Sequence, residues 1–344
     1  MRLRHHLPSW LVTVICLAIA VVLPFVVPTY YVQFTAKALI MGMLAMALNL
    51  AVGHGGLVSL CHAAFFGLGG YVLAILSPRY DAASLLLTLP LAVLASAIAA
   101  LVIGALALRT RGVYFIMVTL AFGEMLFFFF HDTKVAGGSD GVFINVKPAI
   151  AIAGRQLLDL DKPMTFYFVV LACLVAVIAL LTMVLRSPFG HALAAARDNE
   201  RRARSLGYPI FRIRLIAFVI SGALAGIAGY LAVAQFGFVA PQMLGWHQSA
   251  TVLVMVLIGG LRSVSGPLLG ALVLIGLEEV LKANLDNWKL AEGLIIIAIV
   301  VMLPSGIQQI WSMIFVRPAE RASVGVPHGA TVVEAEANHA KRQA

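Results

Sequence analysis

Long apolar runs separated by short polar segments dominate this chain. A bilayer core offers the backbone no hydrogen-bonding partner, so apolar runs of spanning length are expected to be helical. Runs of roughly 17 or more residues predict about ten transmembrane helices, at 10–28, 33–52, 56–77, 84–108, 113–131, 164–185, 215–236, 247–261, 264–282 and 291–312. The run at 247–261 is short for a span, and Gly67, Gly69 and Gly70 favour a broken or re-entrant segment at 56–77.

The composition gives the same class. Of 344 residues, 62% are hydrophobic and only 11% are charged, whereas an ordinary soluble domain carries about 25% charged residues. The sequence therefore predicts an all-α, polytopic membrane helix bundle over 1–315. Residues 316–344 show no periodic apolar face and are expected to form a disordered cytoplasmic tail. The run at 10–28 resembles a signal peptide at Ala18–Ala20, but it continues to Val27 and favours an uncleaved first helix.

Charge predicts which side each loop faces. The formal net charge is +9, and membrane proteins keep Lys and Arg in their cytoplasmic loops. With the N-terminus inside, most of the 24 Lys and Arg residues fall on the cytoplasmic side, many of them in the loop 186–214. The loop 132–163 has no net charge and is predicted to be external. Both termini are then cytoplasmic. No basic stretch interleaves with aromatics, so nucleic acid is not an expected partner.

The cytoplasmic loop 186–214 contains helix signals. Ser187 is a candidate N-cap, Pro188 suits the first helical position, and Gly207 suits a helix stop. Between them, apolar residues recur at helical spacing: Ala192, Leu193, Ala196, Ala203 and Leu206. These signals predict one or two short amphipathic helices outside the membrane. Such a stripe can lie on the anionic leaflet, held by its arginines, or dock a cytoplasmic protein.

Several segments resemble a known family. Ser187–Leu193, Arg197–Glu200 and Leu206–Gly207 resemble the ATPase-coupling loop of ABC importer permeases. Further segments resemble, in order, the branched-chain amino-acid permeases of the LivM type: Leu48–Gly67, Arg111–Glu124, Gly137–Gly141, Leu215–Gly229, Val254–Leu261 and Ser265–Ala271. The resemblance covers about residues 36 to 304 and is specific as an ordered series.

The resemblance implies a function and a set of partners. It implies a type II ABC importer permease fold in a bacterial inner membrane, carrying leucine, isoleucine and valine or a similar small solute. The implied partners are a second permease subunit, two cytoplasmic ATPases and a periplasmic solute-binding protein. The chain has no phosphate-binding P-loop motif, so ATP and Mg belong to the partner ATPases. This chain is expected to be no enzyme and to need no cofactor.

The resemblance also assigns roles in the coupling loop. Ser187, Pro188, Gly190 and Gly207 would shape the element. A second group, Asp198, Asn199 and Glu200, would contact the ATPase. The sequence departs from the family at Cys61, where Gly is common, and at Phe127, where Arg is frequent. These departures keep urea, amides and aromatic acids open as alternative solutes.

Four polar residues inside apolar runs are candidates for a solute pathway: Asn49, His62, Thr119 and Glu124. A polar group within a span is by default a functional hypothesis, although helix-packing hydrogen bonds explain it too. Glu124 would also suit an ion-coupled secondary transporter, but such proteins often show two matching halves, and no clear internal repeat occurs here. The three cysteines, Cys16, Cys61 and Cys173, have neither disulfide nor zinc spacing, and no metal is expected.

Small residues recur at four-residue spacing in two runs. Gly222, Gly226 and Gly229, with Ala225, lie in one, and Gly266 and Gly270 in another. Such faces let helices approach closely. They predict close helix packing, with a dimer face as the alternative.

Overall fold

Most of the apolar runs form helices in the computed structural model. The structure describes residues 20–78, 82–144, 146–152, 155–158, 160–261, 263–302 and 306. Residues 20–26 are helical, whereas the start of the predicted run at 10–28, the end of the run at 291–312 and the predicted tail at 316–344 lie outside the described residues. The fold is all-α apart from a few short strands.

The helices follow one another along the chain, with the longest connections between α5 and α6 and between α6 and α9. The membrane-type helices are α2 (Thr29–Asn49), α3 (His62–Leu76), α4 (Leu85–Ala107), α5 (Val113–Asp132), α6 (Pro163–Arg186), α9 (Ile210–Phe236), α10 (Trp246–Gly259), α11 (Gly266–Asn284) and α12 (Trp288–Met302). A π-helical turn, η1 (Leu50–His54), extends α2, and the linker between α6 and α9 forms α7 (Pro188–Asp198) and α8 (Glu200–Ser205).

Length and polarity divide these helices. Within the described residues, five are long and apolar enough to cross a membrane: Thr29–His54, Leu85–Ala107, Val113–Asp132, Pro163–Arg186 and Ile210–Phe236. The apolar helices α3 and α10 are shorter, and α11 ends in a segment that carries Glu278, Glu279 and Lys282. The number of spans, predicted as about ten, stays a prediction.

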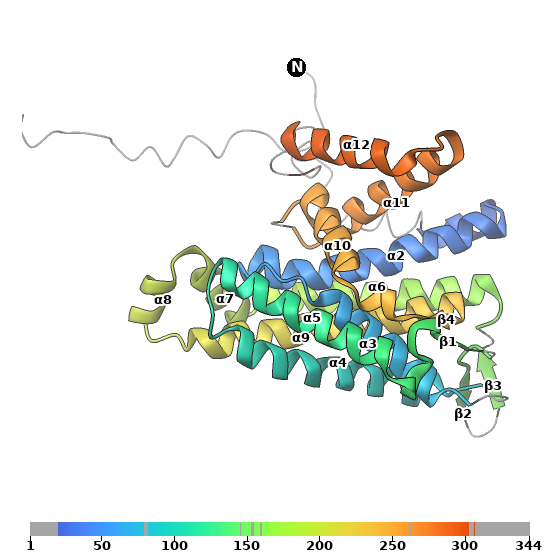
Figure 1. The fold of residues 1–344 in the computed structure, drawn as a ribbon, viewed down its shortest axis with the longest axis horizontal. Helices are drawn as coiled ribbons and strands as arrows, with labels where there is room; N and C mark the ends of the chain where they lie inside the picture. Colours follow the sequence, from blue (N-terminus) through green and yellow to red (C-terminus); the bar gives the residue numbers. More distant parts are fainter. Residues whose placement is uncertain are drawn as a thin grey trace, which may run out of the picture.

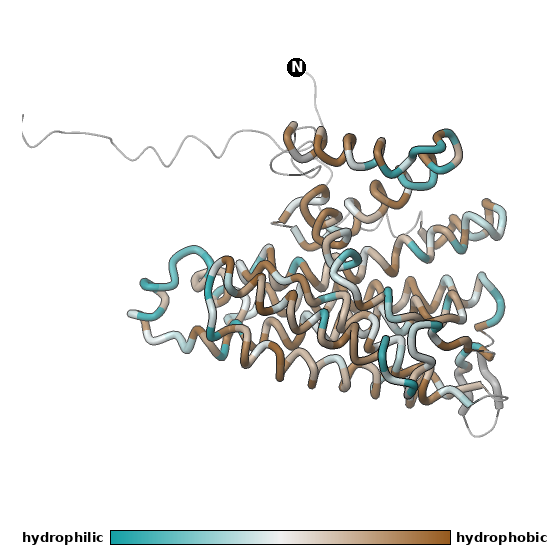
Figure 2. Tube along the Cα trace, in the orientation of Figure 1, coloured by the Kyte–Doolittle hydropathy of each residue, from teal (hydrophilic) through white to brown (hydrophobic). Residues whose placement is uncertain are grey.

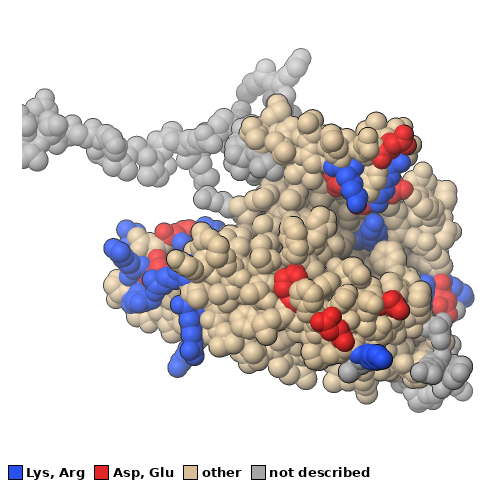
Figure 3. All heavy atoms as spheres, viewed as in Figure 1, with Lys and Arg blue, Asp and Glu red and all other residues tan. Residues whose placement is uncertain are grey.

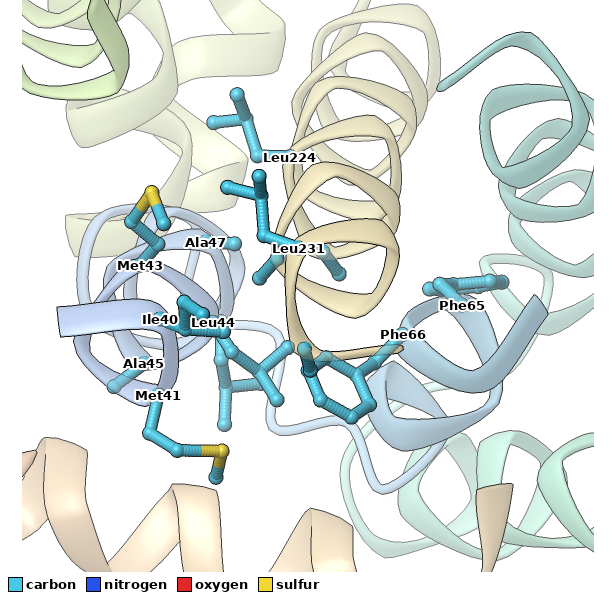
Figure 4. Packing of buried hydrophobic residues seen from close by; sticks show 14 of the residues in the cluster. Ile40, Met41, Met43, Leu44, Ala45, Ala47, Phe65, Phe66, Leu224 and Leu231 are labelled. Carbon is cyan, nitrogen blue, oxygen red and sulfur yellow. The ribbon is translucent and has the colours of Figure 1, made fainter. Parts of the chain in front are cut away.

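The core lies around α2 and α9. In α2, 94% of the most apolar window is buried, against 28% in α4 and 22% in α5. The central helix α9 packs against α3, α4 and α2, and α2 packs in turn against α6 and α11. Figure 4 shows Ile40 and Leu44 of α2, Leu231 of α9 and Phe66 of α3 gathered in this core. The outer helices leave apolar side chains exposed, as a lipid-facing surface requires.

The connections gather at the two ends of the bundle (Figure 1). At one end lie α7, α8 and the α4–α5 connection. Arg111 of that connection forms an ion pair with Glu200 of α8. At the other end, β1 (Val142–Phe143) pairs with β4 (Phe238–Val239), and β2 (Ile150–Ile152) pairs with β3 (Arg155–Leu158), both antiparallel. Figure 2 shows hydrophobic colour along the helices between these ends, and Figure 3 shows Lys and Arg gathered around α8.

The loop predicted as external at 132–163 therefore has structure of its own. Besides three of the four strands, it contains the 3-10 turns η2 (Lys134–Ala136) and η3 (Gly138–Asp140). A similar turn, η4 (Pro241–Leu244), precedes α10. The loop 186–214, predicted to be cytoplasmic, lies at one end of the bundle and the loop 132–163, predicted to be external, lies at the other, which is the geometry a spanning bundle needs.

A break in the helix lies where the sequence run 56–77 begins. Residues 55–61 are not helical, and α3 starts only at His62. The glycines expected to break this segment lie inside α3 instead. They make room for neighbours, since a Cβ on Gly69 would lie 2.2 Å from the carbonyl oxygen of Gly226 in α9. The break is tolerated because most of its residues are buried in protein rather than exposed to lipid.

Candidate functional site

Local capping sets the boundaries of the linker helices. Ser187 is the N-cap of α7, with Pro188 at its first position, and its Oγ accepts a hydrogen bond from the Gly190 amide at 3.4 Å. Asn199 separates the two helices and caps α8, because its side chain accepts the Arg202 amide at 3.0 Å. Gly207, with φ +85°, follows α8 in the left-handed region that glycine adopts without strain.

The apolar stripe of this linker faces the bundle. Ala192, Leu193 and Ala196 of α7 and Ala203 of α8 are buried, and Ala196 and Ala203 pack together with Ile210. The expectation that the stripe needs the leaflet or another protein to cover it is therefore wrong for these four residues, because the chain's own helices cover them. Leu206, which is 70% exposed, is the member of the stripe that remains free.

Glu200 holds the linker to the rest of the bundle. Its carboxylate oxygens pair with Arg214 of α9 at 2.9 Å, Arg204 of α8 at 2.8 Å and Arg111 of the α4–α5 connection at 3.1 Å. Partial burial alone would raise the pKa of Glu200, but the hydrogen bond and charge of Arg214, with Arg111 and Arg204, lower it overall. Glu200 is therefore a charged intramolecular tie.

The other predicted ATPase contacts are more open. The side chain of Asp198 is 67% exposed although it pairs with Arg197 at 2.8 Å, and Asn199 is exposed as well. Beside them, an open depression is lined by Arg111, Glu200, Arg201, Arg204 and Ser205. This end of the molecule thus offers a surface rich in arginine with one exposed carboxylate at its edge.

His62 begins a buried polar chain at the start of α3. Its Nε2 lies 2.7 Å from Ser221 Oγ of α9, and its Nδ1 lies 3.2 Å from Ser59 Oγ in the break. Ser221 in turn donates to the carbonyl oxygen of Ala47 in α2 at 2.5 Å. His62, Ser59 and Ser221 are all fully buried. Their hydrogen bonds connect α2, α3 and α9 where α3 begins.

Two further hydrogen bonds lie near the break, one donated by Asn49 and one accepted by Thr119. Asn49 Nδ2 donates to the Ser263 carbonyl at 2.7 Å, while its buried Oδ1 has no hydrogen-bond partner within the described part of the chain. Thr119 Oγ1 of α5 accepts the Leu60 amide at 3.3 Å. The structure therefore places Thr119 beside residues 49–62, the region between α2 and α3 whose two ends are Asn49 and His62.

Glu124 lies apart from that group. Its Oε1 accepts the backbone N–H of Trp246, the first residue of α10, at 3.1 Å. A carboxylate at a helix N-terminus accepts a hydrogen bond from a free amide and interacts favourably with the positive end of the helix dipole. The contact gives Glu124 a packing function, and the side chain is still partly exposed.

The five predicted packing glycines all face helices or turns of this same chain. A Cβ atom would lie 2.4 Å from Ala100 Cβ at Gly222, 2.3 Å from Ser96 Oγ at Gly226, 1.7 Å from Phe66 O at Gly229, 2.3 Å from Ser263 Oγ at Gly266 and 2.0 Å from Met255 O at Gly270. These spaces are filled within the subunit, which leaves the glycines no room to form a dimer face.

Sequence reasoning missed several residues of the site. Ser59, Ser221 and Ser249 are isolated serines in apolar runs, and nothing in their spacing distinguishes them. Ser249 Oγ accepts the Ala63 amide at 3.0 Å and so caps the start of α3. Among the described residues, no group of three His, Cys, Asp or Glu side chains is arranged to hold a metal ion.

A bundle of apolar helices with a folded, arginine-rich linker at one end defines a polytopic membrane protein with the organisation of a transport permease. The chain belongs to the family described as the branched-chain amino acid transport system permease component, whose model matches residues 30–303.

Individual relatives agree with this assignment. The chain is 33% identical over 310 residues to the high-affinity branched-chain amino acid transport system permease protein LivM of Salmonella typhimurium, and 32% identical to LivM of Escherichia coli. Each alignment covers 85% of this chain and 73% of the relative. The autoinducer 2 import system permease LsrC of Klebsiella pneumoniae is 33% identical over 34% of this chain and 36% of its own. No solved structure matches the chain.

Proposed function

We propose that this chain is a permease subunit of an ATP-driven importer that carries leucine, isoleucine and valine across a bacterial inner membrane. The similarity to LivM along 85% of the chain supports the solute class. The observation that carries the mechanism is the linker itself. Two capped helices, α7 and α8, pack on the bundle through a buried face and present an exposed charged edge.

The proposal includes partners outside this chain. A second permease subunit completes the pore, two cytoplasmic ATPases bind ATP and Mg, and a periplasmic binding protein delivers the solute. Both termini lie in the cytoplasm, on the side where the arginine-rich linker meets the ATPase. Ser187, Pro188, Gly190 and Gly207 give the linker its shape, and Asp198 with the helix break at Asn199 forms the ATPase-facing edge.

The same proposal places the solute near the break between α2 and α3. Asn49, His62 and Thr119 supply polar groups there, and Glu124 lies five residues beyond Thr119 on α5. A zwitterionic amino acid needs few polar partners in a permease, because weak binding favours release. The unpaired Oδ1 of Asn49 is one available acceptor.

Uptake of labelled leucine tests the function. The chain would be reconstituted in proteoliposomes with its ATPases and binding protein, with ATP inside or absent. We expect uptake only with ATP, competition by isoleucine and valine, and none by urea, amides or aromatic acids. Deleting residues 190–204 should abolish uptake while the protein remains in the membrane.

Two outcomes would contradict the proposal. Uptake driven by a proton or sodium gradient without ATP would make the chain an ion-coupled transporter. ATP-dependent uptake of labelled urea, an amide or an aromatic acid, with no uptake of leucine, would keep the ATP-driven mechanism but replace the solute.

A further inference from the structure

Arg197 reaches from the linker into the membrane bundle. Its Nη1 donates to the backbone carbonyl of Gly53 at 2.5 Å, while Nε and Nη2 hold the neighbouring Asp198 at 3.0 and 2.8 Å. The arginine stem runs over Gly56, where a Cβ atom would lie 2.9 Å from Arg197 Cγ. Arg197 thus joins α7 to the end of α2, and its side chain is only 25% exposed.

The segment that receives Arg197 is the π-helical turn η1, residues 50–54. Its hydrogen bonds are irregular, since the Gly55 amide bonds the Leu50 carbonyl at 3.1 Å and the Leu57 amide bonds the Ala51 carbonyl at 2.9 Å. The last carbonyls of a helix lack partners within the helix, so the arginine satisfies an otherwise free Gly53 oxygen. Single π-helical turns store a local irregularity and occur frequently at functional sites.

The turn also contacts the α10–α11 connection. A Cβ on Gly53 would lie 2.0 Å from the carbonyl oxygen of Leu261, so the backbones touch without a side chain between them. Four residues earlier, Asn49 donates to the Ser263 carbonyl at 2.7 Å. Any displacement of η1 must therefore move Leu261 and Ser263 or break these contacts.

Beyond the turn, the chain leads directly into the candidate solute region. The break begins at Gly55, the Leu60 amide bonds Thr119 of α5, and His62 bonds Ser221 of α9. Arg197 thus lies at one end of a continuous series of contacts, and Asn49, Thr119 and His62 lie along it. Close-packed contacts of this kind pass on a displacement because they rearrange between discrete states rather than deform smoothly.

We propose that Arg197 is a positioning residue that couples α7 to the π-helical turn of α2, so that movement of the linker changes the helix break beside the solute region. The proposal rests on the ATP-driven function proposed above and specifies its transmission step. A purely structural Arg197 would only hold α2 in place. A transmitting Arg197 also sets how much solute moves for each ATP hydrolysed.

The test compares Arg197→Gln, Arg197→Lys and Arg109→Gln in the complete reconstituted importer. Arg109 is an exposed arginine of the α4–α5 connection at the same end of the bundle, outside the linker, and controls for loss of charge. A hydrogen bond from a charged group shifts an equilibrium by on the order of tenfold or more. We expect Arg197→Gln to lower the leucine moved per ATP by about that factor while ATP hydrolysis persists.

The conservative variant and the control sharpen the result. Arg197→Lys keeps a charged donor and should recover part of the leucine moved per ATP. Arg109→Gln should match wild type in this ratio. Equal ratios for Arg197→Gln and Arg109→Gln would overturn the proposal. Joint loss of hydrolysis, uptake and ATPase binding would also overturn it, because Arg197 would then act in docking rather than in transmission.

Amide hydrogen exchange of the assembled complex tests the contact between Arg197 and Gly53, whichever solute is carried. In Arg197→Gln, exchange at residues 53–57 should rise at least about tenfold relative to Arg109→Gln, because η1 loses its tether. Unchanged exchange there would overturn the inference. If the wild-type complex moved no branched-chain amino acid but Arg197→Gln still loosened 53–57, the proposed solute would fail while the tether stood.

Discussion

A close approach of α3 and α9 makes Gly229 a sharp test of the packing. A Cβ atom there would lie 1.7 Å from the carbonyl oxygen of Phe66, and real Cβ atoms essentially never come closer than 3.0 Å. The substitution Gly229→Ala therefore requires the two helices to separate by more than 1 Å at this point. In a close-packed interior, that separation removes dispersion contacts on both sides of the crossing.

The expected cost follows from two opposing effects. Overpacking a core typically costs about 1–3 kcal/mol, and the upper end applies here because a backbone carbonyl cannot rotate away. The higher helix propensity of alanine offsets about 1 kcal/mol of this. The net loss of stability is about 2 kcal/mol, which for a chain of 344 residues corresponds to roughly 3 °C in the midpoint of thermal unfolding.

The assay follows the fraction of purified protein that stays monodisperse after stepwise heating in one detergent. All variants share one heating rate because unfolding of such proteins is often irreversible. Gly276→Ala is the matched control, since no heavy atom lies within 4 Å of its Cβ position. Gly226→Ala should fall between the two, because the Ser96 hydroxyl at 2.3 Å can rotate, whereas Ser96 Cβ at 2.6 Å cannot and requires a smaller shift of the helices than Phe66 O does. Equal midpoints for Gly229→Ala and Gly276→Ala would refute the reasoning.

Three further predictions concern the linker. Glu200→Gln should cost about 1–3 kcal/mol of local stability, because Arg214 loses a charged partner, and protease cleavage at 199–207 would report it. In the wild type the lowered pKa of Glu200 means that its ion pairs are fully present above the ordinary value of 4.5. They are lost only as the pH falls through the lowered pKa, so cleavage should rise only under more acidic conditions. Ser187→Ala should cost about 1 kcal/mol by removing the N-cap of α7, measured as faster amide exchange at 189–191. Gly207→Ala should cost about 1 kcal/mol of linker stability through its positive φ alone, and Gly207→Asn should cost less. Equal melting midpoints of the linker in these two variants would contradict this order.

The sequence alone determined the class of this protein and the local form of its linker. Apolar run lengths predict helices because the backbone in lipid must bond within its own segment. Caps are local too, so Ser187, Pro188 and Gly207 indicate where the linker helices begin and where they end without any tertiary information. The ordered family segments identified the permease family for the same reason, because they are read directly from the chain.

Only the tertiary structure decided which residues meet. Glu124 bonds Trp246, and Glu200 pairs with Arg111 and Arg214, through helix crossings that no local pattern encodes. Glycine spacing predicts a close approach but not which helix approaches. The sequence predicted a broken segment at 56–77 but not the position of the break before His62, which depends on partners for its backbone in α5 and α10. Periodicity and capping act within a few residues, whereas polar groups in an apolar bundle are satisfied by whichever helix the packing brings beside them.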